Sequence, residues 1–174
     1  ANLRVGDKFT LQGDIAKNAV ILAAAYNGSK VVRWLVVNGV LQTPTEITLP
    51  AAMGTAPCAT ATGTNADSDL IVNSQGKNII LYSSTGVNKG SLSNTIIDVD
   101  SNSTKYFELN GYSYLAVFQS KQTANSPIGH NCRIVDITDG FAAATIVNTT
   151  DRLGNDINGN ATGDVDVRYS NSPL

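Results

Sequence analysis

A run of oxygen-bearing side chains near the end of the chain has the spacing of a metal site. The first, third, fifth and ninth places of a calcium-binding loop are filled by Asp156, Asn158, Asn160 and Asp164. Ca²⁺ takes roughly six to eight oxygen ligands, which alternating side chains on a tight loop can supply. Ala161 stands at the sixth place, where a sharp turn favours Gly, and the twelfth place lacks the usual Glu. We therefore favour a polar connection between strands, with calcium as the alternative and no other cofactor.

The sequence offers no assembled catalytic set. His130 is the only histidine and stands in a loop-like stretch, residues 126–131. A serine triad needs a nucleophile and an acid around such a base, and no Gly-x-Ser-x-Gly elbow occurs. Asp67 and Asp69 stand at alternate positions, so both would lie on one face of a strand. Carboxylates placed in this way are more often solvated than arranged on either side of a substrate, as the two acids of a glycosidase are. We expect that the protein is not an enzyme.

Aromatic side chains are the remaining candidates for binding. Tyr112 and Tyr114 follow Gly111 at alternate positions, so both project to the same face of a strand. Tyr112 then lies near a loop rim, where its ring could stack on a ligand. Trp34 stands in a strand-like run, and the matching region of a later run contains Tyr82, which favours packing between structural units. Tyr112, Tyr114 and Trp34 are the predicted ligand-binding residues, with packing as the alternative.

These candidates lie within an internal repeat. Four short segments end in an apolar residue, then Gln, Asn or Thr, then a glycine: Gly13, Gly63, Gly111 and Gly163. The glycines are 50, 48 and 52 residues apart. A period of about 40–50 residues built from strands is typical of stacked β-units such as propeller blades.

Each unit contains further strand-like runs rich in Val, Ile, Leu and aromatic residues. The runs cover residues 19–22, 30–37 and 45–49, then 70–72, 78–82 and 95–99, then 114–118, 133–137 and 144–148. The middle run of each unit leads to a turn dipeptide, Asn38-Gly39, Thr85-Gly86 or Asp139-Gly140. Asn-Gly and Asp-Gly suit tight hairpin turns because these residues tolerate positive φ, whereas Thr resists it.

The predicted fold is all-β, made of consecutive four-stranded antiparallel blades of a β-propeller. A single repeat domain, 1–174, would hold three complete units at about 1–50, 51–100 and 101–150, and part of a fourth at 151–174. A β-trefoil is the alternative, but the fourth glycine favours the propeller because a trefoil has three units. Closed propellers have roughly four to eight blades. We therefore expect part of a larger propeller, in which residues 159–174 pair with or pack on another polypeptide.

Composition bears on the partners and the location. Only 15% of the residues are charged and the formal net charge is −2, so no basic patch suits nucleic acid. No apolar run approaches the roughly 20 residues of a membrane span, and we expect none. The surface is solubilised by neutral polar groups, from which we predict an extracytoplasmic protein.

The two cysteines are not expected to form a disulfide. Cys58 and Cys132 fall in different strands, and we expect two separate apolar side chains rather than a disulfide.

Parts of the repeat also resemble a known family. The residues that carry the resemblance are Leu11-Gln12-Gly13-Asp14, Asn160-Ala161-Thr162-Gly163-Asp164-Val165, and Arg133-Ile134-Val135-Asp136-Ile137 before Asp139-Gly140. They are similar to blades of the uncharacterised secreted or surface β-propellers of gut-type bacteria. The resemblance covers most of the chain and implies a propeller that is secreted or at the cell surface. The family brings no established activity and no catalytic residues.

The expected function is non-catalytic recognition or adhesion at a surface. In this interpretation, short loops on a rigid β scaffold bind a glycan or a protein partner. The alternative is a fragment of a propeller enzyme that acts on polysaccharide and whose catalytic residues lie outside this chain.

Overall fold

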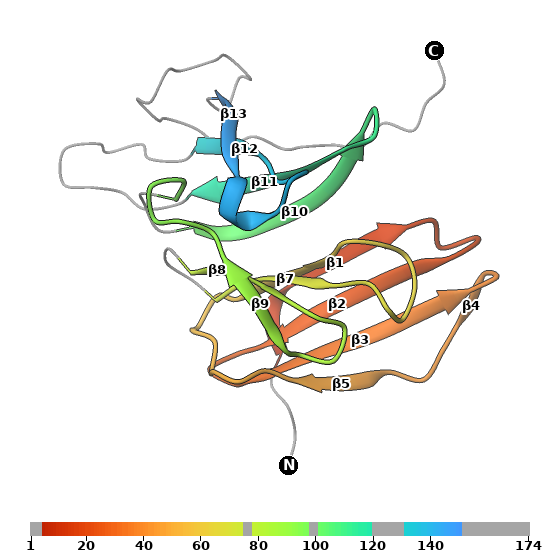
Figure 1. The fold of residues 1–174 in the computed structure, drawn as a ribbon. Helices are drawn as coiled ribbons and strands as arrows, with labels where there is room; N and C mark the ends of the chain where they lie inside the picture. The colour runs from red at the N-terminus through yellow and green to blue at the C-terminus, as the bar shows by residue number, and fades with distance from the viewer. Residues whose placement is uncertain (1–4, 75–77, 98–100, 120–130, 151–174) are drawn as a thin grey trace.

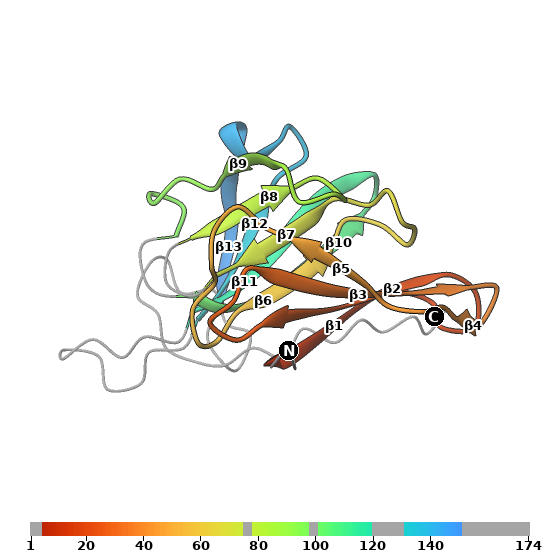
Figure 2. The same ribbon diagram turned by 90° about the horizontal axis from the view of Figure 1, so that it is seen from below.

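The computed structural model describes residues 5–74, 78–97, 101–119 and 131–150 of the 174-residue chain. Within these residues the protein is all-β, with three separate antiparallel sheets and one short 3₁₀ turn. We name them sheets A, B and C in chain order. Figure 1 shows sheet B between the other two, and Figure 2 shows the same arrangement from below.

Sheet A is built by the first third of the chain. Its strands are β1 (Val5–Gly13), β2 (Ala19–Ala25), β3 (Lys30–Val37), β4 (Val40–Leu41) and β5 (Thr45–Thr48). The order is β1-β2-β3-β4, and β5 also pairs with β3. The predicted runs at 19–22, 30–37 and 45–49 are therefore confirmed as strands.

Sheet B is short and covered on both sides. Its strands are β6 (Cys58–Ala61), β7 (Leu70–Asn73), β8 (Ile79–Tyr82) and β9 (Asn88–Ser91), in that order. Every residue of β6 and β7 is buried. These two strands read as continuous runs of apolar and small residues because both of their faces are covered.

Sheet C contains the longest hairpin. Its strands are β10 (Ser101–Leu109), β11 (Tyr112–Gln119), β12 (Asn131–Asp136) and β13 (Thr145–Thr150), and the turn η1 (Phe141–Ala143) lies between the last two. The order β10-β11-β12-β13 repeats the meander of sheet B.

Two hydrophobic cores lie on opposite faces of sheet B. Leu70 belongs to the core shared with sheet A, which includes Val20, Leu22 and Val31 of that sheet. The next residue, Ile71, belongs to the core shared with sheet C, which includes Leu115. Successive side chains of a strand point to opposite faces, so β7 contributes to both cores.

The three predicted turns have different outcomes. Asn38 and Gly39 have φ values of 50° and 77° and join β3 to β4 directly, as predicted. Gly86, with φ of 90°, closes a tight connection between β8 and β9, also as predicted. The prediction of a tight hairpin at Asp139-Gly140 is wrong. Gly140 leads into η1 because Phe141 is buried against the B–C core, and β13 begins only after that turn.

The repeat glycines Gly13, Gly63 and Gly111 each lie at or just after the end of the first strand of a sheet, as predicted. Gly13 and Gly111 have φ values of 99° and 82°, whereas Gly63 does not adopt positive φ.

The predicted strand at 95–99 is wrong in its described part, 95–97, which contains no strand because residues 94–96 form a turn. The turn at Gly86 reverses the chain so that the residues after it pair with β8. Asn88–Ser91 therefore form β9, the fourth strand of sheet B, although these residues have low intrinsic strand propensity.

Candidate functional site

An aromatic ladder lies on the face of sheet C that points away from sheet B, which we call the outer face of sheet C. The ladder consists of two cross-strand pairs of β10 and β11, Phe107 with Tyr114 and Leu109 with Tyr112. The rings of Phe107 and Tyr114 stack, with centroids 5.4 Å apart and an interplanar angle of 23°. Leu109 and Tyr112 are 57% and 53% exposed. The ladder therefore presents an apolar surface to solvent at the tip of the hairpin.

The turn between β10 and β11 positions the ladder. Asn110 and Gly111 have φ values of 53° and 82°, the conformation that a two-residue hairpin turn requires. This turn pairs Leu109 with Tyr112 across the strands and thereby places Phe107 opposite Tyr114.

Sequence reasoning found Tyr112 and Tyr114 but missed Phe107 and Leu109. The signal that could have found them is the Asn-Gly dipeptide flanked by alternating apolar residues, which specifies the cross-strand register.

The other face of the same hairpin is polar near its tip. The Tyr106 hydroxyl donates to Glu108 Oε1 at 2.6 Å and lies 3.1 Å from Ser113 Oγ. The flat apolar surface on the ladder side can stack on a sugar ring or an apolar side chain. The arrangement suits binding, and no nucleophile and base face one another in it.

Trp34 lies on the outer face of sheet A rather than between two of the described sheets. Its ring contacts Phe9 on the outer face of sheet A, with centroids 6.2 Å apart. Trp34 alternates with Val31 and Leu35, which face sheet B, because successive side chains of β3 point to opposite faces. Tyr82 fills the space between sheets A and B instead, and this burial raises its pKa. The structure thus separates Trp34 from the aromatic ladder by placing them on different sheets.

The first strands of the three sheets lie next to one another. Thr10 Oγ1 of β1 donates to the carbonyl of Ala59 in β6, and the Tyr106 amide of β10 donates to Thr60 Oγ1 at 3.3 Å. Lys105 of β10 reaches β1, where its ammonium donates to the Leu11 carbonyl and to Gln12 Oε1 at 3.0 Å. Burial lowers the pKa of Lys105, and the nearby Cys58 partly offsets this effect.

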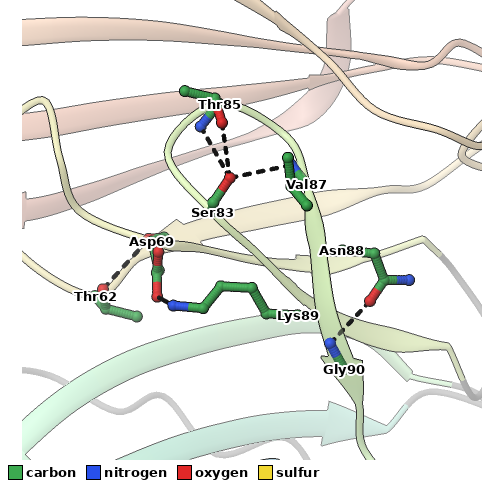
Figure 3. A network of polar contacts seen from close by, with 8 residues as sticks. All are labelled: Thr62, Asp69, Ser83, Thr85, Val87, Asn88, Lys89 and Gly90. Carbon is green, nitrogen blue, oxygen red and sulfur yellow. Dashed lines mark hydrogen bonds and ion pairs between the residues drawn. The ribbon is translucent and has the colours of Figure 1, made fainter.

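The polar network of sheet B shapes its turn, as Figure 3 shows. Ser83 Oγ accepts hydrogen bonds from the amides of Thr85 at 3.3 Å and Val87 at 3.1 Å. Asp69 forms an ion pair with Lys89. The Asp69 carboxylate is thus paired with a cation rather than aligned with Asp67 toward a substrate.

A half-buried cation links sheets A and B. Arg33 of β3 donates to the carbonyl of Ala66 at 2.6 Å, in the connection between β6 and β7. Burial lowers the pKa of Arg33, and the charge of Asp67 partly offsets this effect. Arg33 therefore holds a connection of sheet B against sheet A.

The predicted calcium ligands Asp156, Asn158, Asn160 and Asp164 lie outside the described residues, as does His130. Where the structure does describe the chain, no three His, Cys, Asp or Glu side chains gather into a cluster that could hold a metal ion. Cys58 is a buried free thiol whose sulfur lies 3.5 Å from the Thr104 carbonyl oxygen.

The fold and the ladder define an all-β protein of three antiparallel sheets packed face to face, one of five strands and two of four, with an exposed aromatic hairpin. The family model of a domain of unknown function (DUF8500) matches residues 1–157. The chain belongs to this family. A comparison with curated proteins found no match. Among the residues that the structure describes, no helix has the length and apolar character to cross a bilayer.

Proposed function

We propose that the protein is a non-catalytic recognition module that binds a glycan or a protein partner through the tip of the β10–β11 hairpin. The observation that carries the proposal is the exposure of Leu109 and Tyr112, 57% and 53%, on a hairpin with a well-defined register. Exposed apolar residues that cluster beside polar ones mark interaction sites more often than scattered ones do.

The chemistry of the hairpin tip fits a ligand with one apolar face. The Tyr112 ring offers a flat surface, and its hydroxyl can donate and accept hydrogen bonds at the margin. The ladder is held by a tight turn and two paired strands, so little conformational entropy is lost when a ligand binds. A pyranose ring or an apolar side chain of a protein meets these requirements.

The proposal extends to the arrangement of the sheets, which we take as consecutive blades of a β-propeller. The four-stranded meanders of sheets B and C and the neighbouring first strands of the three sheets support it. Phe9 and Leu11 are 61% and 44% exposed on the outer face of sheet A, a surface suited to a further sheet from another polypeptide. The neutral polar composition suits a secreted or cell-surface protein.

The test is binding to a panel of glycans and surface proteins, measured with the wild type, Tyr112→Ala and Val40→Ala. Val40→Ala is the matched control because it removes an exposed apolar side chain that follows the hairpin turn of a different sheet. A ligand that stacks on the β10–β11 hairpin tip should bind about tenfold more weakly to Tyr112→Ala, equivalent to about 1.4 kcal/mol, and unchanged to Val40→Ala. Turnover of a substrate by homogeneous protein, or binding that is insensitive to Tyr112→Ala, would contradict the proposal.

A further inference from the structure

Asn-Gly pairs are chemically labile, and the chain contains four of them. The glycine amide nitrogen can attack the side-chain carbonyl carbon of the preceding asparagine, because glycine has no Cβ to hinder the approach. The pairs stand at residues 27–28, 38–39, 110–111 and 158–159, and the last lies outside the described residues. In a folded protein the reaction requires a glycine nitrogen that is free to attack and a peptide plane that can rotate.

Two of these pairs form the same kind of turn. Asn38 and Asn110 have φ values of 50° and 53°, and the glycines that follow them have φ values of 77° and 82°. Each pair joins two antiparallel strands directly, β3 to β4 and β10 to β11. Both asparagines are exposed. The two turns are alike in local geometry, so a difference in reactivity must come from their surroundings.

The turn of sheet A is held by its neighbours. The Gly39 amide donates to the Lys17 carbonyl at 2.7 Å, so the nitrogen that would attack Asn38 is occupied. The Asn38 amide in turn donates to Asn18 Oδ1 at 3.1 Å. A Cβ on Gly39 would lie 3.1 Å from the Ala16 carbonyl oxygen, so the surroundings leave little room for this peptide to rotate.

The first pair is fixed by the connection that follows sheet A. The Asn27 amide donates to the Gly54 carbonyl at 3.0 Å. The Gly28 carbonyl accepts a hydrogen bond from the Met53 amide at 2.8 Å. The peptide between Asn27 and Gly28 is therefore restrained on both sides.

The turn at the tip of the β10–β11 hairpin has no such restraint. The Gly111 amide has no hydrogen-bond acceptor among the residues that the structure describes. A two-residue turn joins the residues on either side of it by a hydrogen bond and does not use this amide. A Cβ on Gly111 would meet nothing within 4 Å. The peptide between Asn110 and Gly111 can therefore rotate and bring the glycine nitrogen to the side-chain carbonyl carbon.

We propose that Asn110-Gly111 is a site of spontaneous deamidation, at which the hairpin tip changes as the protein ages. The Gly111 nitrogen attacks Cγ of Asn110, the new C–N bond closes a succinimide ring, and ammonia leaves. One water then opens the ring at either of its carbonyls. Opening at Cγ gives aspartate, and opening at the main-chain carbonyl gives isoaspartate.

The two products affect the turn differently. Aspartate tolerates positive φ and keeps the length of the backbone, so it adds only a negative charge. Isoaspartate carries the backbone through the former side chain and lengthens the turn by one carbon. The longer turn does not fit the register that pairs Leu109 with Tyr112. The inference does not rest on the proposed function, although Tyr112 belongs to both sites.

The test is tryptic peptide mapping of the full chain during incubation at mildly alkaline pH, in native buffer and in urea. Trypsin places the three described pairs on different peptides, and fragmentation identifies the modified residue. In the native protein we expect deamidation at Asn110 to be about tenfold faster than at Asn38, equivalent to about 1.4 kcal/mol in the barrier. In urea, where neither glycine amide is held, the two rates should become similar.

Asn110→Asp is the matched control for the isoaspartate form, because it carries the charge without the longer backbone. Chromatography separates the isoaspartate form from aged wild-type protein. Hydrogen exchange should show loss of protection at the tip of the β10–β11 hairpin in that form and not in Asn110→Asp. Equal native rates at Asn110 and Asn38 would overturn the proposal, as would an Asn110 amide that survives in the native protein but is lost in urea. Retained protection in the isoaspartate form would overturn the predicted effect on register.

Discussion

Single side chains in this protein act mainly by joining sheets. Lys105 is the clearest example, because its ammonium belongs to sheet C and its two acceptors, the Leu11 carbonyl and Gln12 Oε1, belong to sheet A. Its lowered pKa reflects burial. A lysine in this position stabilises an arrangement of sheets rather than a local turn.

The substitution Lys105→Met should therefore destabilise the fold by about 0.5–1.5 kcal/mol, the net range for hydrogen bonds. Methionine keeps the length of the aliphatic stem and removes the donors. Lys89→Met is the control, since it breaks the ion pair with Asp69 inside sheet B, and exposed pairs contribute only about 0–1 kcal/mol. Urea denaturation measures both, and a loss for Lys105→Met no larger than that for Lys89→Met would refute the bridging role.

A second prediction at this scale concerns acid stability. The Asp136 carboxylate accepts a hydrogen bond from the Thr138 amide at 2.9 Å, and this bond, with a further contribution from the Thr138 hydroxyl, lowers the pKa of Asp136. A lowered folded pKa means that the stabilisation is complete above the ordinary carboxyl pKa and is lost as pH falls through the folded value.

Wild-type protein should thus exceed Asp136→Asn in stability at neutral pH, and the difference should shrink below about pH 4. Thr138→Ser keeps both hydrogen-bonding groups and should retain the wild-type acid dependence. Urea midpoints across the acid range provide the measurement. A difference between wild type and Asp136→Asn that stays constant down to pH 2 would show that the Asp136 charge does not matter.

At the scale of elements, tight turns determine which residues face one another. Gly13 and Gly111 occupy matching places in the repeat and both have positive φ, but their surroundings differ. A Cβ on Gly13 would lie 2.4 Å from the Asn18 carbonyl oxygen and 2.6 Å from Thr64 Cγ2. A Cβ on Gly111 would meet nothing within 4 Å.

Gly111→Ala should consequently cost only the backbone strain of positive φ, about 1–2 kcal/mol. Gly13→Ala should cost more, because the backbone of Asn18 must also move away. Thermal or urea unfolding of the two variants checks the order. Equal losses of stability in the two variants would show that Asn18 and Thr64 move away from an added Cβ at Gly13 at no cost in free energy.

At the scale of the whole molecule, sheet B connects the other two because its faces form both cores. Leu70 and Ile71 are neighbours in the sequence, are both fully buried, and serve different cores. Sheets A and C each depend on sheet B for a large part of their apolar burial, so the described sheets should unfold together.

Leu70→Ala and Ile71→Ala should each reduce stability by about 2–5 kcal/mol, the usual range for such truncations in a core. We expect a single unfolding transition in both variants, followed by tryptophan fluorescence for sheet A and circular dichroism for the whole chain. Phe9→Ala, at an exposed site, should have a much smaller effect. Separate transitions for the two probes in Ile71→Ala would show that the A–B pair folds without sheet C.

The sequence alone was sufficient for most of the strands and turns, because alternation and turn chemistry are local properties of the chain. The runs at 30–37 and 133–137 and the Asn38-Gly39 turn are found from the pattern of residues. Local pattern failed where a distant contact decided the structure. Burial of Phe141 extends the connection after Asp139-Gly140, and pairing with β8 makes Asn88–Ser91 a strand.

Only the tertiary structure decided which face of each sheet meets its neighbour. Phe9 and Phe107 both stand four residues before a repeat glycine, yet Phe9 points away from the following sheet whereas Phe107 points away from the preceding sheet. Alternation fixes which residues share a face but not which face is buried, because a shift of one residue in register exchanges the two. The same reason explains why Tyr112 and Tyr114 were found on one face by their spacing, while the place of Trp34 and the bridge from Lys105 to sheet A required the packed sheets.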